Sequence, residues 1–368
     1  MVDSMRFFKR RLREYSLENE IKKRWLPSSC GLILDNLRNL QPVWRAESTF
    51  FEKFLSGIES RSGVSLGRRL AHASSESEEF LSKISGFPAP KGSNPAKWSD
   101  TKLDWLTRGI GNFELLDKSD EIRVIIRYPI NGPICTGVFS SNWELATQNR
   151  HRFRWTQNKF ESLILILSKD DVEIPQPNEF SLSWSHVTPE ISFEDDEYFW
   201  DSLEVESEKY WSLMGSRYAM INQDLIIRFE SYYQPYLNDI HEGRIDSFEW
   251  EGVDSDKSLL WTIFSDTIRE IFYDQAHHIL ISEDDDWINV SKRHLSKQGL
   301  GKINFVKSID KFGGIECSFN SCFHPAIFCG ILSGCWERAN GRTVKCNFSN
   351  NGETNIVRLM SMNEISSN

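Results

Sequence analysis

Cysteine and histidine side chains cluster near the C-terminal end of the chain, and thiolate and imidazole groups are ligands that zinc prefers. Nineteen residues contain five such side chains: Cys317, Cys322, His324, Cys329 and Cys335. No two of the cysteines have the Cys-x2-Cys spacing of a closed zinc site. Cys329 and Cys335 also fall on different faces if the segment is helical. We therefore expect thiols buried as small apolar side chains; the alternative is a zinc site formed by Cys322, His324 and Cys329.

Aromatic side chains of the same region could instead form the wall of a pocket for a flat, apolar ligand. Trp336 lies in the segment GILSGCWERA (330–339), and Trp143 has the same position in GVFSSNWELA (137–146). Small-molecule pockets are lined mainly by such side chains together with a few polar groups. The candidate ligand-binding residues are Trp143, Phe323, His324, Cys329 and Trp336. The competing interpretation, which we prefer, is that both tryptophans belong to the core.

No motif of an established catalytic class occurs in the sequence. The stretch SGVSLGRR (62–69) lacks the lysine context of a P-loop and the glycine spacing of a dinucleotide site. No Gly-x-Ser-x-Gly nucleophile elbow occurs. The motifs therefore leave open whether the chain is an enzyme, and they favour a non-catalytic protein.

Charge and hydropathy exclude further classes of protein. The chain of 368 residues has 43 Lys and Arg against 53 Asp and Glu, a net charge of −10. Because binding to nucleic acid needs a basic surface, we expect no nucleic-acid partner. No segment approaches the roughly 18 consecutive apolar residues of a membrane-spanning helix, and the first residues lack the apolar stretch of a secretory signal. With seven cysteines in no regular framework, we expect reduced thiols and a cytoplasmic location.

Residues 1–27 differ from the rest of the chain in being basic, with eight cations against four acids. Phe7, Phe8, Leu12 and Tyr15 fall near helical spacing, which predicts an amphipathic helix. Such a helix could contact a membrane surface or an acidic partner. The alternative, which we prefer, is that it packs against the acidic body of its own chain.

Two stretches of the sequence resemble each other and predict a tandem repeat. Residues 105–146 align with 294–339, with Gly109-Ile-Gly111 matching Gly299-Leu-Gly301. In both copies the pattern predicts two strands, a helix and two more strands. These elements are 112–117, 122–128, 137–146, 152–156 and 162–167 in the first copy, and 302–308, 315–319, 326–339, 343–348 and 354–360 in the second. The predicted fold class is α+β, with two units that each have helices followed by β-β-α-β-β and an antiparallel sheet.

The repeat also predicts the domain organisation. Helices are expected at 50–59 and 67–84 before the first copy, and at 200–240, 257–276 and 287–298 before the second. We expect a basic N-terminal helix (1–27), a first unit (28–168), a linker rich in proline and acid (169–195), and a second unit with its preceding helices (196–368). The acidic and aromatic stretch 193–211 could present Tyr198, Phe199 and Trp200 to a partner; we prefer to place these rings at an interface between the units.

The second copy resembles the 4-vinyl reductase domain, whose superfamily includes the ligand-sensing domains of some bacterial activators and subunits of Golgi transport tethers. The segments that carry the resemblance are GLGKINFV, IECSFNSCFHPAIFCGILSGCWERANGRTVKC and NGETNIVRL. The family enters its helix with a Gly-x-x-x-Gly step, here Gly330 to Gly334. Of the cysteines that metal-binding members carry on the last two strands, only Cys346 has a counterpart in this chain.

The resemblance implies a non-catalytic scaffold of two such units that binds a small apolar molecule or a protein partner. The alternative is an enzyme or accessory factor that acts on a tetrapyrrole or another flat aromatic compound. Zinc or a tetrapyrrole-like molecule is the cofactor that these interpretations would allow.

Overall fold

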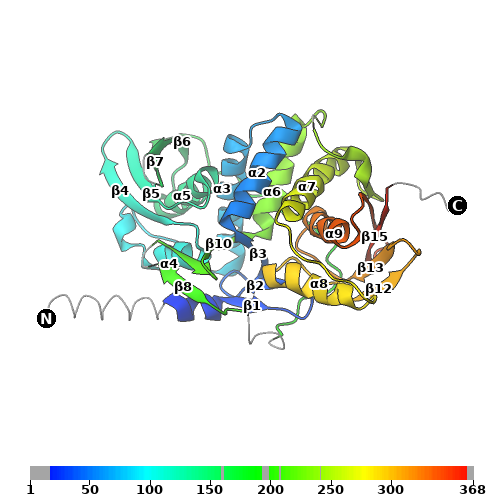
Figure 1. Ribbon diagram of the computed structural model, residues 1–368. Helices are drawn as coiled ribbons and strands as arrows, with labels where there is room; N and C mark the ends of the chain where they lie inside the picture. Colours follow the sequence, from blue (N-terminus) through cyan, green and yellow to red (C-terminus); the bar gives the residue numbers. More distant parts are fainter. Residues whose placement is uncertain (1–16, 159–160, 193–198, 207–208, 241, 363–368) are drawn as a thin grey trace.

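The computed structural model describes residues 17–158, 161–192, 199–206, 209–240 and 242–362 (Figure 1). After a helical segment at residues 17–24, the described first half has three strands, three helices and then a strand-strand-helix-strand-strand unit. These elements are β1 (Trp25–Pro27), β2 (Ile33–Asp35), β3 (Gln41–Glu47), α2 (Ser48–Ser62), α3 (Gly67–Ser85), α4 (Ser99–Arg108), β4 (Asn112–Lys118), β5 (Ile122–Arg127), α5 (Gly132–Thr147), β6 (His151–Asn158) and β7 (Ser162–Lys169).

The second half repeats this order, with one additional strand, β11. Its elements are β8 (Leu203–Glu206), β9 (Tyr210–Leu213), β10 (Ser216–Asn222), α6 (Gln223–Tyr233), β11 (Phe248–Trp250), α7 (Ser255–Asp274), α8 (Asp286–His294), β12 (Phe305–Ser308), β13 (Ile315–Phe319), α9 (Pro325–Asn340), β14 (Val344–Asn350) and β15 (Asn355–Ser361). Helices and mainly antiparallel sheets confirm the predicted α+β class.

The described strands form three sheets. The six-stranded sheet has the order β1-β2-β3-β10-β9-β8, so each half supplies three neighbouring strands. They join where β3 pairs antiparallel with β10, with Trp44 opposite Ile221. The smaller sheets have the orders β4-β5-β7-β6 and β11-β14-β15-β13-β12 and lie at opposite ends of the molecule (Figure 1). The tandem duplication stays a prediction, and the common order of elements supports it.

Helices α5 and α9 pack on α3 and α7 at backbone distance because glycines face the neighbouring helix. A Cβ atom on Gly137 of α5 would lie 2.1 Å from the carbonyl oxygen of Ala71 in α3, and one on Gly330 of α9 would lie 2.8 Å from that of Ser265 in α7. Both helices begin at a side-chain cap: Asn131 accepts a hydrogen bond from the N–H of Ile134, and the His324 ring accepts one from Ala326. The helices beside the two smaller sheets, α5 and α9, therefore pack closely against α3 and α7, respectively.

The repeated Gly-x-Gly turns connect the two halves. Gly109 and Gly299 have φ values of +70° and +78°, which favour glycine. A Cβ atom on Gly109 would lie 2.5 Å from the carbonyl oxygen of Tyr218 in β10, and one on Gly299 would lie 2.5 Å from that of Val43 in β3. Each turn thus abuts a strand that belongs to the other half.

One large hydrophobic core spans both halves. Across the contact between α2 and α7, the rings of Phe54 and Phe264 lie 5.2 Å apart with T-shaped geometry. In the connecting segment 170–192, Ile191 forms an isolated bridge with Ser28. Trp184 of this segment is buried against Trp261. The expected linker is therefore partly packed into the core.

The structure contradicts the helix expected at 200–240, because strands β8 to β10 occupy 203–222 and α6 begins at Gln223. Met214 and Gly215 both have positive φ and form a two-residue hairpin loop between β9 and β10. This geometry is typical of a type I′ turn, in which the second residue is usually glycine. Strands β1 to β3 were not predicted either.

Residues 17–24 are helical and pack on the body of the chain. Leu17, Ile21 and Trp25 are buried in a small second core with Phe199, Trp211 and other residues. Trp200 packs against Phe199 and Trp211 of the same half. The Arg45 guanidinium of the first half lies 5.6 Å from the centre of the Trp200 ring. That these rings form an interface between two units stays a prediction. The expectations for residues 1–16 and for Tyr198 lie outside the described residues.

Candidate functional site

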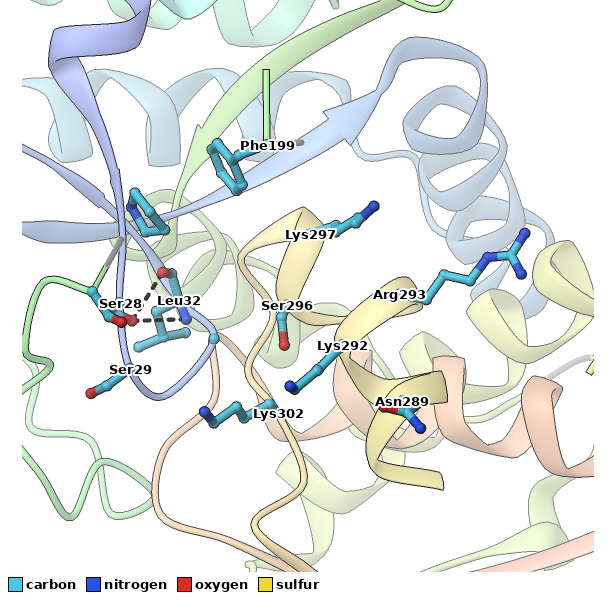
Figure 2. A pocket seen from close by; sticks show the side chains of 13 residues that line it. Ser28, Ser29, Leu32, Phe199, Asn289, Lys292, Arg293, Ser296, Lys297 and Lys302 are labelled. Atoms are coloured by element: carbon cyan, nitrogen blue, oxygen red, sulfur yellow. Dashed lines mark hydrogen bonds between the residues drawn. The ribbon is translucent and has the colours of Figure 1, made fainter. Parts of the chain in front are cut away.

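A cavity of about 460 Å³ lies where the turn between β1 and β2 meets α8 and the loop that follows it (Figure 2). We refer to it as the basic cavity. The two halves and the segment between them contribute its walls. Its lining residues are Pro27, Ser28, Ser29, Gly31, Leu32, Ser192, Phe199, Asn289, Lys292, Arg293, Ser296, Lys297 and Lys302.

Backbone contacts between the halves fix the walls of the basic cavity. The N–H of Gly301 donates to the carbonyl oxygen of Gly31 at 3.0 Å, and Leu32 forms an isolated bridge with Leu300. The Ser28 hydroxyl donates to the Leu32 carbonyl at 2.9 Å, and Ser296 donates to that of Gly301 at 3.1 Å. The cavity is therefore bounded by paired backbone, which favours a preformed site.

The charge of the basic cavity is opposite to that of the whole chain. The lining residues that the structure describes include four cations and no acidic side chain, although the chain has a net charge of −10. Within the described part of the chain, no ion pair is formed by Lys292, Arg293, Lys297 or Lys302. In Figure 2 the side chains of Lys292 and Lys302 point toward the side where Ser29 lies, and those of Arg293 and Lys297 point away. The cavity thus presents two ammonium groups to an incoming anion.

The described lining residues can bind a ligand but offer no obvious catalytic group. They include no histidine, cysteine, aspartate or glutamate. The hydroxyl groups of Ser28 and Ser296 already donate to backbone carbonyls. Without a neighbouring base, a serine hydroxyl is a weak nucleophile. Pro27, Leu32 and Phe199 add an apolar wall on which an organic group could pack.

The five residues expected to hold a ligand are buried in the core and do not line the basic cavity. Trp143 lies in α5 beside Trp98, whereas the other four lie in α9 or directly before it. Trp336 donates its indole N–H to the Gly313 carbonyl at 2.7 Å. Phe323, His324, Cys329 and Trp336 are 0 % exposed, and Trp143 is 1 % exposed. The structure therefore does not bring the five together around an open site.

Both ring nitrogens of His324 are occupied by hydrogen bonds. Nδ1 accepts from the N–H of Ala326, so Nε2 carries the proton and donates to Glu230 at 2.8 Å. Burial raises the pKa of the thiols of Cys322 and Cys329 well above the usual range, which keeps both protonated. Across the described ranges, no three His, Cys, Asp or Glu side chains are placed to hold a metal ion. Cys322, His324 and Cys329 are thus not arranged as a zinc site.

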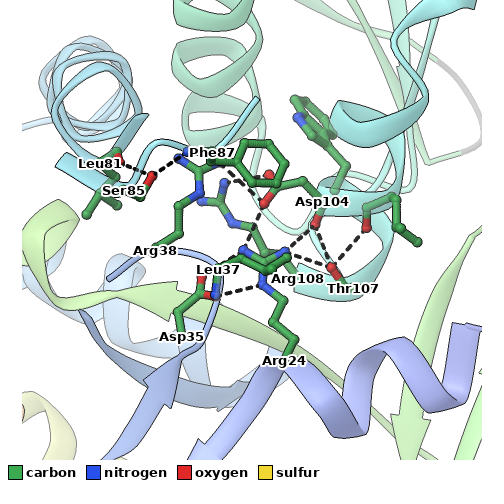
Figure 3. Close-up of polar contacts among 12 residues, drawn as sticks. Arg24, Asp35, Leu37, Arg38, Leu81, Ser85, Phe87, Asp104, Thr107 and Arg108 are labelled. Carbon is green, nitrogen blue, oxygen red and sulfur yellow. Dashed lines mark hydrogen bonds and ion pairs between the residues drawn. The ribbon is translucent and has the colours of Figure 1, made fainter. Parts of the chain in front are cut away.

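A second polar cluster is fully enclosed and serves the fold (Figure 3). Asp104 lies 2.8 Å from Arg24, 3.4 Å from Arg38 and 3.3 Å from Arg108. Burial alone would raise the pKa of Asp104, but these three guanidinium groups hold it well below its usual range. The complete cluster, which we call the buried ionic network, balances three cations with three anions: Arg24, Asp35, Arg38, Glu78, Asp104 and Arg108.

The sequence contains a signal for the basic cavity that the motif search did not use. No acidic residue lies between Asp286 and Asp310, although that interval has five cations. In a chain with more acids than bases, such an interval indicates a local anion-binding surface. The sequence does not show which residues form the opposite wall of the cavity, because Gly31 and Gly301, which are hydrogen-bonded in the structure, are far apart in the chain.

Comparison of the chain with models of protein families, with curated proteins and with solved structures found no match. In the part of the chain that the structure describes, no helix has the length and apolar character needed to cross a membrane.

Proposed function

We propose that the chain is a non-catalytic binding scaffold, built from two units that resemble the 4-vinyl reductase domain, which holds a small molecule in the basic cavity. The observation that carries the proposal is the cavity itself. Its volume of about 460 Å³ falls within the range of about 300–1,000 Å³ that is usual for small-molecule sites. Its walls come from both halves, so the paired units would act together as one binding body.

The chemistry of the lining supports binding without reaction. Apolar side chains at one part of the cavity and cations at another suit a ligand with an organic body and a negative group. The common order of strands in the two smaller sheets supports the two-unit architecture. A reaction on a tetrapyrrole or another flat aromatic compound has no comparable support, because the residues expected to hold such a ligand are packed in the core.

Native mass spectrometry of the chain purified from its own source tests this proposal. We expect a bound small-molecule mass in the wild type that is lost in Ser29→Trp, because Ser29 lines the cavity, is exposed, and can be enlarged without disturbing the core. Ser65→Trp is the matched control, since Ser65 is also exposed but is not a lining residue of the basic cavity. This variant should retain the bound mass.

A wild-type chain without bound small molecules would contradict the proposal if a panel of neutral and anionic metabolites also failed to raise its melting temperature. A bound mass that Ser29→Trp retains would place the ligand elsewhere.

A further inference from the structure

We infer that the ligand of the basic cavity carries a phosphate monoester, held by the ammonium groups of Lys292 and Lys302. This inference rests on the proposed function and names the class of ligand. Lys302 is half-buried, and Lys292 is exposed in the last turn of α8. Neither makes an ion pair with a described carboxylate, and the described lining residues include no acidic side chain. Two such cations facing one cavity repel each other until an anion binds.

A doubly charged anion matches this arrangement better than a singly charged one. A phosphate monoester has a charge of about −1.5 to −2 at pH 7 and three acceptor oxygens. Two ammonium groups supply matching charge, and charge-assisted hydrogen bonds are stronger than neutral ones. The exposed Arg293 and Lys297 add a positive field at the rim. The organic part of the ester would pack on Leu32 and Phe199, which are buried lining residues.

The first half shows that the fold does not require a cation at the position of Lys302. Aligning Gly109 with Gly299 places Asn112 at this position. The same alignment places Lys102 of α4 at the position of Lys292, so that cation has a counterpart in the first half. Lys302 is therefore a cation of the basic cavity that a binding function explains and that the shared fold does not require.

Isothermal titration with phenyl phosphate measures the inferred affinity, and phenyl sulfate is the control with the same ring and a single charge. We expect phenyl phosphate to bind at least about tenfold more tightly than phenyl sulfate at pH 7.5. Its affinity should fall below pH 6, where the dianionic ester takes up a proton and becomes a monoanion. Added salt should weaken binding, because the charges are partly exposed.

Charge-reversal variants assign the binding to the two lysines. Lys292→Glu and Lys302→Glu should each lower the affinity for phenyl phosphate about tenfold or more, while the matched variant Lys102→Glu on α4 should leave it unchanged. Lys292→Gln and Lys302→Gln give the same comparison with a smaller change of charge, and circular dichroism verifies that each variant is folded. The double variant combines Lys292→Glu with Lys302→Glu. Equal binding of phosphate and sulfate esters, or full binding by this double variant when it is folded, would overturn the inference.

A phosphate monoester could come from a soluble metabolite or from a lipid headgroup. Flotation with phosphatidylcholine vesicles containing phosphatidic acid, compared with vesicles of equal charge containing phosphatidylserine, distinguishes the sources. Selective flotation with phosphatidic acid, lost in the double variant, would identify a lipid headgroup; titration without flotation would identify a soluble ester. The inference would be overturned if the wild type and the double variant both floated with both kinds of vesicle and the chain did not bind phenyl phosphate.

The two proposals fail separately. If native mass spectrometry finds an uncharged ligand that Ser29→Trp excludes, the binding scaffold stands and the phosphate inference is wrong. If the wild type carries no ligand and binds neither the metabolite panel nor phenyl phosphate, both are wrong.

Discussion

Replacing Asp104 by asparagine removes one charge from the buried ionic network and nearly conserves the shape of the side chain. Asp104 contacts three guanidinium groups, so Asp104→Asn leaves three buried cations with the two carboxylates of Asp35 and Glu78. The variant therefore separates electrostatic stabilisation from packing.

The expected loss follows from what each guanidinium retains. Arg24 keeps Asp35 at 2.7 Å, while Arg38 and Arg108 share Glu78, each at 2.8 Å. Removing one partner from a buried ion pair costs about 3–5 kcal/mol. Because every cation keeps one carboxylate, we expect the lower end of this range, about 3 kcal/mol. That is a large share of the roughly 5–15 kcal/mol that stabilises a typical domain.

Urea unfolding followed by tryptophan fluorescence measures this loss, and its pH dependence identifies the cause. The pKa of Asp104 in the folded chain lies below its ordinary value of 3.8. Its ionised form therefore stabilises the fold fully above that value, and this contribution disappears as the pH falls through the folded pKa. The difference between wild type and Asp104→Asn should be largest at pH 7 and should shrink below pH 4.

Asp170→Asn is the control, because Asp170 pairs with the largely exposed Arg152 and its loss should barely move the unfolding midpoint. A loss below about 1 kcal/mol for Asp104→Asn, as for exposed pairs, would refute the reasoning. A loss of the same size at pH 7 and pH 3 would also refute it, since a packing defect does not titrate.

Other regions of the core give further predictions. Burial raises the pKa of Glu144 to about 7, so its protonated form favours the fold and this stabilisation is lost as the pH rises through 7. Glu144→Gln should therefore raise the free energy of unfolding at pH 8 by roughly 2–3 kcal/mol. The same substitution should change it little at pH 4, and urea unfolding measures both values. Trp336→Phe should lower the melting temperature more than Trp143→Phe, and the two variants should differ by about 1 kcal/mol in the free energy of unfolding. The reason is that the Trp336 indole N–H donates to the Gly313 carbonyl, whereas the Trp143 indole N–H has no partner among the described residues. All seven cysteines are buried and burial raises the pKa of Cys135 to about 11, so Ellman's reagent at pH 8 should label the folded chain slowly and all seven thiols after unfolding.

Local patterns predicted the elements whose signal lies within a single segment. The strand predicted at 315–319 is Ile315–Phe319 in the structure, and the helix predicted at 326–339 is Pro325–Asn340. Alternation, helical spacing and turn residues are sufficient for such segments. Strands β1, β2, β8 and β9 were missed because they have only three or four residues. Strands β3 and β10 have seven residues each and pair with each other across the two halves, which no local pattern reveals.

The candidate site was predicted less well than the fold for a related reason. The tryptophans at equivalent positions are core residues, as the preferred interpretation of the sequence held, and they say little about ligands. The basic cavity instead depends on Lys292 and Lys302 facing the turn at Ser29, which lies at the other end of the sequence. Sequence can show that the cations are concentrated there, but only the tertiary fold shows that they share a cavity with the first half.

The shared six-stranded sheet also affects how the chain is made. Strand β3 ends at Glu47, and its partner β10 ends at Asn222. At about 5–20 residues per second, a ribosome needs roughly 9–35 s to synthesise the intervening chain. During that interval the nascent first half exposes an unpaired strand edge that includes Trp44, and such edges readily pair with other chains. We therefore expect the yield of folded chain to rise when nascent chains meet each other rarely, or when chaperones cover this strand edge until β10 emerges.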